Sequence, residues 1–175
     1  MNRILAAVLV TMALTAASDR AAAQTSHDND FTVYVPPRMS LQALRPDQST
    51  THPETVGDVT FRNQLWWATT ASSTGSTIRF TTDTCFVNQD RSGYLRDVRL
   101  QSPRLFGNPS AGWGFDTPVD QTDYAAGDQQ AQVQISGTGP GVALIFLDVT
   151  FITGDLATLA GGDYEVTVVG TITAN

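Results

Sequence analysis

The pattern of apolar and polar positions is clearest in the last third of the chain. Residues 142–147 are all apolar, and the run continues to Ile152 with β-branched and aromatic side chains. A stretch that is apolar on both faces is typical of a strand covered on both sides. After a turn at 154–162, apolar and polar residues alternate as far as Ile172, which predicts a half-buried strand. These two segments predict the core of the protein.

The expected core residues all come from these two segments. They are Val142, Leu144, Ile145, Phe146, Phe151, Tyr164, Val166, Val168 and Ile172. On this prediction Phe146→Ala should cost about 3–5 kcal/mol. Leu156 and Leu159 lie three residues apart, which predicts one helical turn at the end of the core.

Shorter alternating segments precede this pair and are separated by turn residues. The strongest are 31–35, 39–43, 65–70, 77–81, 94–101 and 130–136, with a long connection at 103–110. Pro36 and Pro37 interrupt the first pattern, which favours an edge strand or one that changes sheets. About eight to ten short strands with regular turn signals predict an all-β sandwich or barrel, and we expect the sandwich. Tyr164, which follows a Gly-Asp pair and opens a strand, resembles the tyrosine corner of immunoglobulin-like antiparallel sandwiches, whose hydroxyl binds nearby backbone.

The N-terminus predicts export. Arg3 precedes an apolar segment at 4–17, and the small residues Ala21, Ala22 and Ala23 follow, as in a cleaved secretory signal peptide. We therefore divide the chain into a signal peptide (1–23), a polar leader (24–30) and a single β-sandwich domain (31–175). The protein is expected in the periplasm, at the cell surface or outside the cell, with no membrane insertion after signal cleavage.

Composition excludes several functions. The formal net charge is −7 and there is no lysine, so we expect no nucleic-acid partner, no Schiff-base chemistry and no Walker-type phosphate loop. The single cysteine, Cys85, cannot form an internal disulfide. A small buried residue is the favoured interpretation over an intermolecular disulfide or a nucleophile served by His27 or His52.

Signatures of enzymes are missing: there is no nucleophile elbow, paired-histidine motif or dinucleotide fingerprint. We expect no enzyme and no cofactor. An acidic stretch supplies four weak candidates for a Ca²⁺ site, because calcium takes several carboxylate oxygens. They are Asp116, Asp120, Asp123 and Asp128. A solvated loop is the favoured interpretation of this stretch.

Tryptophan offers another candidate site. Trp66 and Trp67 are adjacent, so on a strand one faces the core and the other faces outward. Trp67 and Trp113 are the candidates for stacking on a sugar ring, although core packing is the favoured role of the tryptophans.

The chain also resembles known exported proteins. The segments 151–159, 162–164, 167–168 and 170–175, with 33–41 and Trp66, resemble small uncharacterised bacterial exported proteins. The closing pattern Gly-x-Tyr-x-x-Thr-Val-x-x-x-Ile-Thr resembles spore-coat-U-like and chaperone–usher pilin subunits, although this chain lacks the paired cysteines of many of them. The resemblance implies a sandwich that assembles with itself or with other surface proteins.

A strand-exchange hypothesis follows from that resemblance. If the strand from Tyr164 is the penultimate strand of an immunoglobulin-like sandwich, the next strand is missing and its groove is open. Phe31, Val33 and Val35 share one face of the leader strand and are the candidates to fill the groove of another subunit. An edge strand within the same domain is the favoured alternative for this segment. The expected function is thus a non-enzymatic structural or adhesive surface or matrix protein; the alternative is a carbohydrate-binding module that uses an exposed tryptophan on polysaccharide.

Overall fold

The computed structural model describes residues 32–34 and 38–175. The predicted signal peptide, the polar leader, Phe31 and Val35 lie outside the described residues. Residues 32–34 belong to the smaller of two units of the chain, 1–35, and form no strand. The strand predicted at 31–35 is therefore not found at its three described positions, and the first strand of the described chain is Met39–Ala43.

The described part of the larger unit is all-β and has no α-helix. Its strands are Met39–Ala43 (β1), Val59–Thr70 (β2), Ser76–Thr82 (β3), Phe86–Asn88 (β4), Leu95–Arg96 (β5), Val98–Gly107 (β6), Gly114–Thr117 (β7), Val119–Gln121 (β8), Ala131–Gly137 (β9), Gly141–Phe151 (β10), Tyr164–Glu165 (β11) and Val169–Ala174 (β12). Two 3₁₀ turns, Pro109–Ala111 (η1) and Leu156–Thr158 (η2), complete the elements. The helical turn predicted at Leu156 is thus confirmed.

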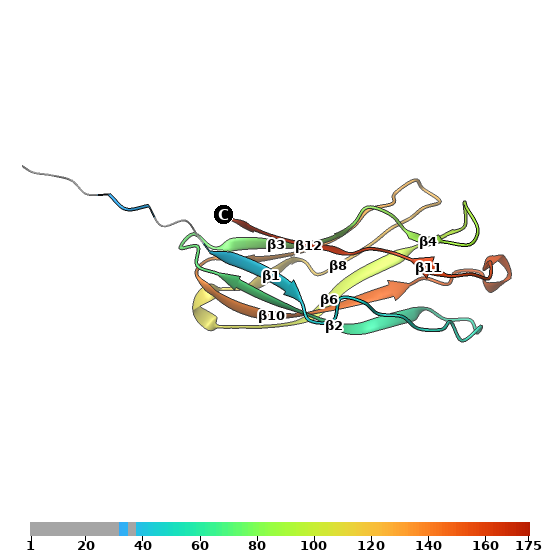
Figure 1. Cartoon of the computed structure of the whole chain (residues 1–175), viewed down its shortest axis with the longest axis horizontal. Helices are drawn as coiled ribbons and strands as arrows, with labels where there is room; N and C mark the ends of the chain where they lie inside the picture. The colour runs from blue at the N-terminus through green and yellow to red at the C-terminus, as the bar shows by residue number, and fades with distance from the viewer. Residues whose placement is uncertain (1–31, 35–37) are drawn as a thin grey trace, which may run out of the picture. The chain divides into compact units, whose positions relative to one another are not determined.

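These strands form antiparallel sheets that pack face to face (Figure 1). The five-stranded sheet has the order β1-β2-β10-β6-β8, and the four-stranded sheet has the order β12-β3-β9-β7. A three-stranded sheet, β11-β4-β5, accompanies them. The predicted all-β architecture is confirmed.

The core lies between the layers and uses alternate residues of each central strand. Its members include Ile78, Phe80, Val98, Leu100, Ala131, Val133, Ile135, Ala143, Ile145, Leu147, Val149 and Phe151. From Ala143 to Val149 the central strand β10 buries its odd-numbered residues, whereas Val142 is 38% exposed and Leu144 and Phe146 are only half-buried. The prediction that these three residues belong to the most buried core is therefore wrong, because the other sheet covers one face of β10 only. The same prediction also fails for Tyr164, Val166, Val168 and Ile172, which are only partly buried against the core, whereas it is confirmed for Ile145 and Phe151.

Two element boundaries also differ from the predictions. The long connection predicted at 103–110 is largely strand, because β6 continues to Gly107. Pro103 is accommodated at an irregularity in the β6–β10 register between Phe146 and Asp148, a position where the missing N–H breaks no ladder. The strand predicted from Tyr164 is divided into β11 and β12, with residues 166–168 between them.

Candidate functional site

A cleft lies at one side of the packed sheets. It begins where β1 ends: β1 pairs with β2 only along residues 66–70, so residues 59–64 of β2 pair with β10 alone. Across the cleft, β11 pairs only with β4 and β12 only with β3. Both walls therefore present backbone edges that no described strand covers.

The floor of this cleft is apolar and the mouth is polar. Phe61, Trp66, Phe86, Leu147 and Val149 form the floor, and residues 164–168 form one wall of a cavity of about 460 Å³. A second cavity of about 810 Å³ adjoins it and shares Phe61, Phe86 and Tyr164. Such a combination of apolar floor and unpaired edges suits an extended peptide, which needs backbone partners and side-chain pockets together.

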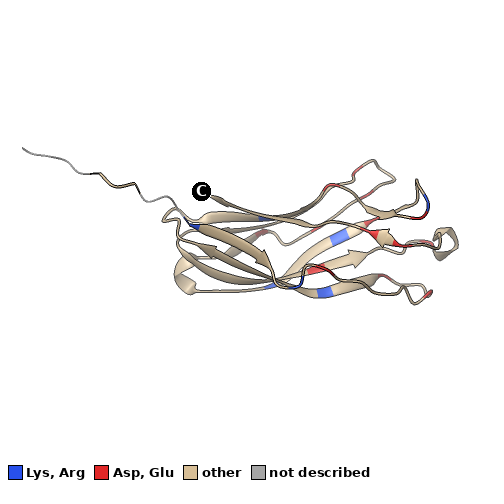
Figure 2. Ribbon diagram, in the orientation of Figure 1, with Lys and Arg blue, Asp and Glu red and all other residues tan. Residues whose placement is uncertain are grey.

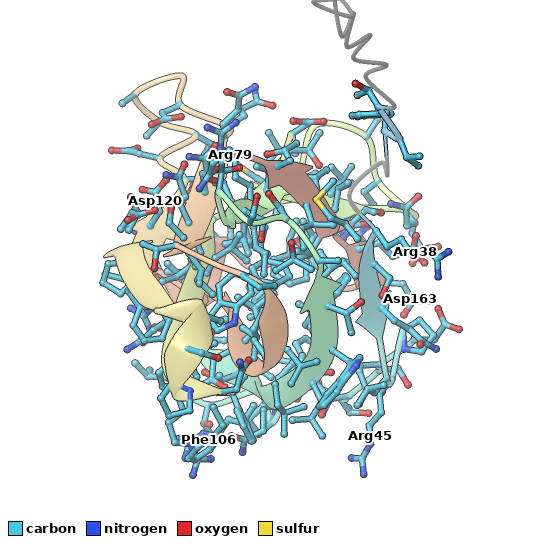
Figure 3. All side chains as sticks on the ribbon, turned by 90° about the vertical axis from the view of Figure 1, so that its left-hand side faces the viewer. Arg38, Arg45, Arg79, Phe106, Asp120 and Asp163 are labelled. Carbon is cyan, nitrogen blue, oxygen red and sulfur yellow. The ribbon has the colours of Figure 1, made fainter. Side chains whose placement is uncertain are left out.

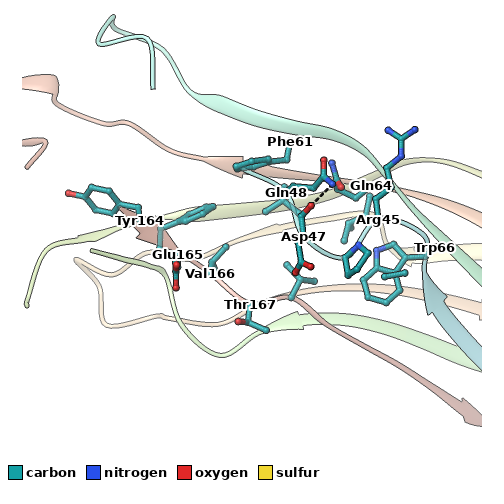
Figure 4. A pocket seen from close by; sticks show the side chains of 16 residues that line it. Arg45, Asp47, Gln48, Phe61, Gln64, Trp66, Tyr164, Glu165, Val166 and Thr167 are labelled. Atoms are coloured by element: carbon teal, nitrogen blue, oxygen red, sulfur yellow. Dashed lines mark hydrogen bonds between the residues drawn. The ribbon is translucent and has the colours of Figure 1, made fainter. Parts of the chain in front are cut away.

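The segment 44–52 crosses the mouth without forming a strand. Asp47 and Gln48 lie between Phe61 on one side and the 165–167 wall on the other (Figure 4). Only the first residue of this segment bonds to the β2 backbone, from Leu44 N to Leu65 O at 2.8 Å. Moving residues 45–48 aside would therefore break no strand pairing.

His52 fastens the far end of that segment. Its Nδ1 accepts from the Glu54 backbone N–H at 3.0 Å, so Nε2 carries the proton and donates to Thr153 Oγ1 at 2.9 Å. The ring also meets Phe151 edge-on, with centroids 5.9 Å apart. Both ring nitrogens are thus used in holding the loop.

Cys85 is fully buried next to β4, and this interpretation is confirmed. Burial raises the pKa of its thiol, and the nearby Asp97 carboxylate adds to the effect. The thiol donates to Asp97 Oδ1 at 3.7 Å, which also accepts from Thr122 Oγ1 at 2.9 Å. Since a nucleophile requires a thiolate, this environment favours a structural cysteine.

The four aspartates proposed for calcium do not gather into one site. Each carboxylate accepts hydrogen bonds from nearby protein groups: Asp116 from Ser136 and Gln134, Asp120 from the Gln132 backbone, Asp123 from the Ala126 backbone and Asp128 from the Gln130 backbone. No group of three or more metal-binding side chains occurs among the described residues. Bonds from Ser136 and Gln134 lower the pKa of Asp116.

The two sugar-stacking candidates have different environments. Trp67 is 39% exposed on the outer face of the five-stranded sheet, while Trp66 packs against Phe80 with ring centroids 5.0 Å apart. The opposite orientation of the two tryptophans is as predicted. Trp113 instead packs over Gly107 and Gly137, where an added Cβ would lie 2.5 and 2.8 Å from its ring. Its indole Nε1 is buried, so Trp113 fills a corner of the core.

Sequence reasoning missed most residues of the cleft and of the sheet face around Trp67. The cleft is lined by the end of β2, by 164–168 and by the segment 44–52 at its mouth; these segments meet only in the tertiary structure, and no local signal marks them. No helix of the described chain is long and apolar enough to cross a membrane. A scan against protein-family models and searches of curated proteins and solved structures found no match.

Proposed function

We propose that this chain is an exported, non-enzymatic structural or adhesive protein of the cell surface or matrix, built on an immunoglobulin-like, pilin-like sandwich. The observation that carries the proposal is the apolar cleft bounded by two backbone edges that no described strand pairs with, behind the non-strand segment 44–52. Exposed edges of this kind pair with another chain unless something blocks them. The expected partner is another copy of this chain or a second surface protein.

The immunoglobulin-like assignment is supported by the corner at Tyr164. The tyrosine hydroxyl donates to the backbone carbonyl of Ala160 at 3.2 Å, which is the bond expected of a tyrosine corner. The ring also packs edge-on against Phe151, with centroids 5.3 Å apart. This residue therefore links the turn at 154–162 to the core beside the cleft.

The segment proposed to enter the cleft is the stretch around Val33 of another subunit, which forms no strand at its described positions in the single chain. Phe31, Val33 and Val35 alternate with Thr32 and Tyr34, so one face is apolar and would meet the partly buried apolar side chains that line the cleft, such as Phe61 and Val166. Five residues of strand span about 17 Å and the six uncovered residues of β2 about 20 Å, so the lengths are compatible. Main-chain hydrogen bonds to β2 would supply affinity, and the side chains would supply register.

The test compares mature protein, residues 24–175, with a variant lacking residues 24–35. We expect the mature protein to form oligomers or fibres in light scattering and negative-stain images. The deletion variant should stay soluble and monomeric, and a synthetic peptide of residues 24–35 should raise its melting temperature.

Point variants separate side-chain recognition from a general effect of the leader. A double variant, Phe31→Asp with Val33→Asp, should abolish assembly, whereas Thr32→Asp on the opposite face should leave it intact. If the mature protein is monomeric at high concentration, the proposal is wrong. If the deletion lowers stability at every concentration, the segment is an edge strand of its own domain.

A further inference from the structure

The outer face of the five-stranded sheet carries an apolar patch that the core does not use. Its side chains come from the neighbouring strands β2, β10 and β6 and form rows across them. One row is Trp67, Leu144 and Phe106, and the next is Leu65, Phe146 and Arg104. On the other side of the first row, Thr69 of β2 pairs with Val142 of β10. We call Leu65, Trp67, Phe106, Val142, Leu144 and Phe146 the aromatic patch. Phe106 is 58% exposed, and it lies on the outside of this layer (Figure 3).

The other sheet shows that such a face is not a general property of this fold. Its equivalent central row is polar: Arg79 pairs with Gln134 on one side and Thr171 on the other, and Arg79 Nε donates to Gln134 Oε1 at 2.9 Å. An outward antiparallel face is normally polar. A contiguous exposed apolar patch on one face therefore indicates a binding surface.

The side chains of the aromatic patch are held in place before any ligand arrives. Phe106 meets Phe146 edge-on with centroids 5.7 Å apart, and the Arg104 guanidinium lies 4.7 Å from the Phe146 centroid. Arg104 also donates to the Asn63 side-chain oxygen at 2.8 Å, and Asn63 N–H donates to Asp148 at 2.7 Å. Planar hydrogen-bonding groups thus border the ring faces.

We propose that the aromatic patch binds a neutral polysaccharide. Sugar rings present C–H faces that stack on aromatic side chains, while their hydroxyls bind planar amide and guanidinium groups. Trp67 and Phe106 lie two strand spacings apart, roughly 10 Å. A ligand that contacts both side chains must therefore contain more than one sugar ring, as a polysaccharide does. Gln42 flanks Trp67 in the same row, and Arg104 lies in the next.

Area and charge decide between this ligand and other occupants. Several of the six side chains are half-buried, so they expose an apolar area on the order of a few hundred Å², against about 800 Å² per partner in a standard protein interface. The patch is thus small for a stable dimer. The chain carries a net charge of −7, and the strands that bear the patch have few charged positions around it (Figure 2). This overall negative charge repels an acidic polymer at long range, which favours a neutral one, and Arg104 beside Phe146 then acts as a hydrogen-bond donor to sugar hydroxyls.

The test measures retention of the mature protein on cellulose, on chitin and on gels containing soluble neutral glucan or xylan, with alginate as the acidic comparison. We expect binding to at least one neutral probe, and Trp67→Ala or Phe106→Ala should weaken it about tenfold or more. Trp67→Phe should restore part of the binding. The matched control is Tyr94→Ala, because Tyr94 is 44% exposed but lies outside the patch; its binding should be unchanged.

Three results would overturn the proposal. These are binding to none of the neutral probes, stronger binding to alginate than to any neutral probe, or a dimer in light scattering that Phe106→Ala dissociates. Melting temperatures of both patch variants show whether lost binding reflects unfolding, and Phe106→Ala serves if Trp67→Ala fails to fold. The variant lacking residues 24–35 should bind like the mature chain, since the patch does not involve the cleft.

Discussion

Ile145 and Phe146 are neighbours on β10 whose side chains face opposite sides of the sheet. Ile145 is fully buried between the layers, so Ile145→Ala leaves a cavity and should cost about 3–4 kcal/mol. Phe146 is half-buried on the outer face, with Phe106 and Arg104 as its ring partners. Its removal opens space to solvent and leaves no closed cavity, so Phe146→Ala should cost only about 1–2 kcal/mol.

Denaturant unfolding of both variants measures this difference. The midpoint should fall further for Ile145→Ala while the denaturant dependence stays unchanged. In thermal unfolding each kcal/mol should lower the melting temperature by about 2–4 °C for a chain of this size. If Phe146→Ala costs as much as Ile145→Ala, then β10 is covered on both faces and the aromatic patch does not exist as a free surface.

Four further predictions concern single groups. Because burial raises the pKa of Cys85, its thiol should react with iodoacetamide at pH 8 at least about tenfold more slowly in native than in unfolded protein; equal rates would contradict this. Tyr164→Phe removes the bond to Ala160 and should cost about 0.5–1.5 kcal/mol in denaturant unfolding. Hydrogen bonds from Ser136 and Gln134 lower the pKa of Asp116 below its ordinary 3.8, so its contribution is present above pH 3.8 and lost as the pH falls through the lower folded value. The effect is small at this exposed site, and Asp116→Asn should slightly flatten the acid side of a melting-temperature profile. Dialysis against EDTA should leave the melting temperature unchanged, and a large drop would indicate a bound metal ion.

The sequence predicted elements well where alternation is strong and local. The strand at 39–43 matches β1, and 130–136 matches β9 within one residue, with Ala131, Val133 and Ile135 facing the core. Both strands bury one face only, so period two is visible without knowledge of their neighbours. The same local reasoning located the turn at Leu156.

Predictions failed where the answer depends on the second layer. Leu144 and Phe146 are apolar, and a sequence does not distinguish an outward apolar row covered by another layer from one left exposed. For Trp113 the favoured role, core packing, is confirmed, but its partners Gly107 and Gly137 approach it only in the folded chain and carry no local signal. The cleft exists because β1 ends at Ala43 while β2 extends to Val59, a mismatch in length that tertiary pairing determines.

The cleft lies at an edge of the five-stranded sheet, whereas the aromatic patch lies on the outer face of the same sheet. A strand added beside residues 59–64 would extend the sheet within its plane and take up backbone groups at its edge. The aromatic patch projects from the outer face of β2, β10 and β6, so strand addition leaves it open. If subunits join through the cleft, the assembly displays one patch per subunit. A repeated polysaccharide could then contact several patches at once, and weak individual binding would give strong attachment through effective concentration. A small patch on each subunit would therefore be enough for an adhesive assembly.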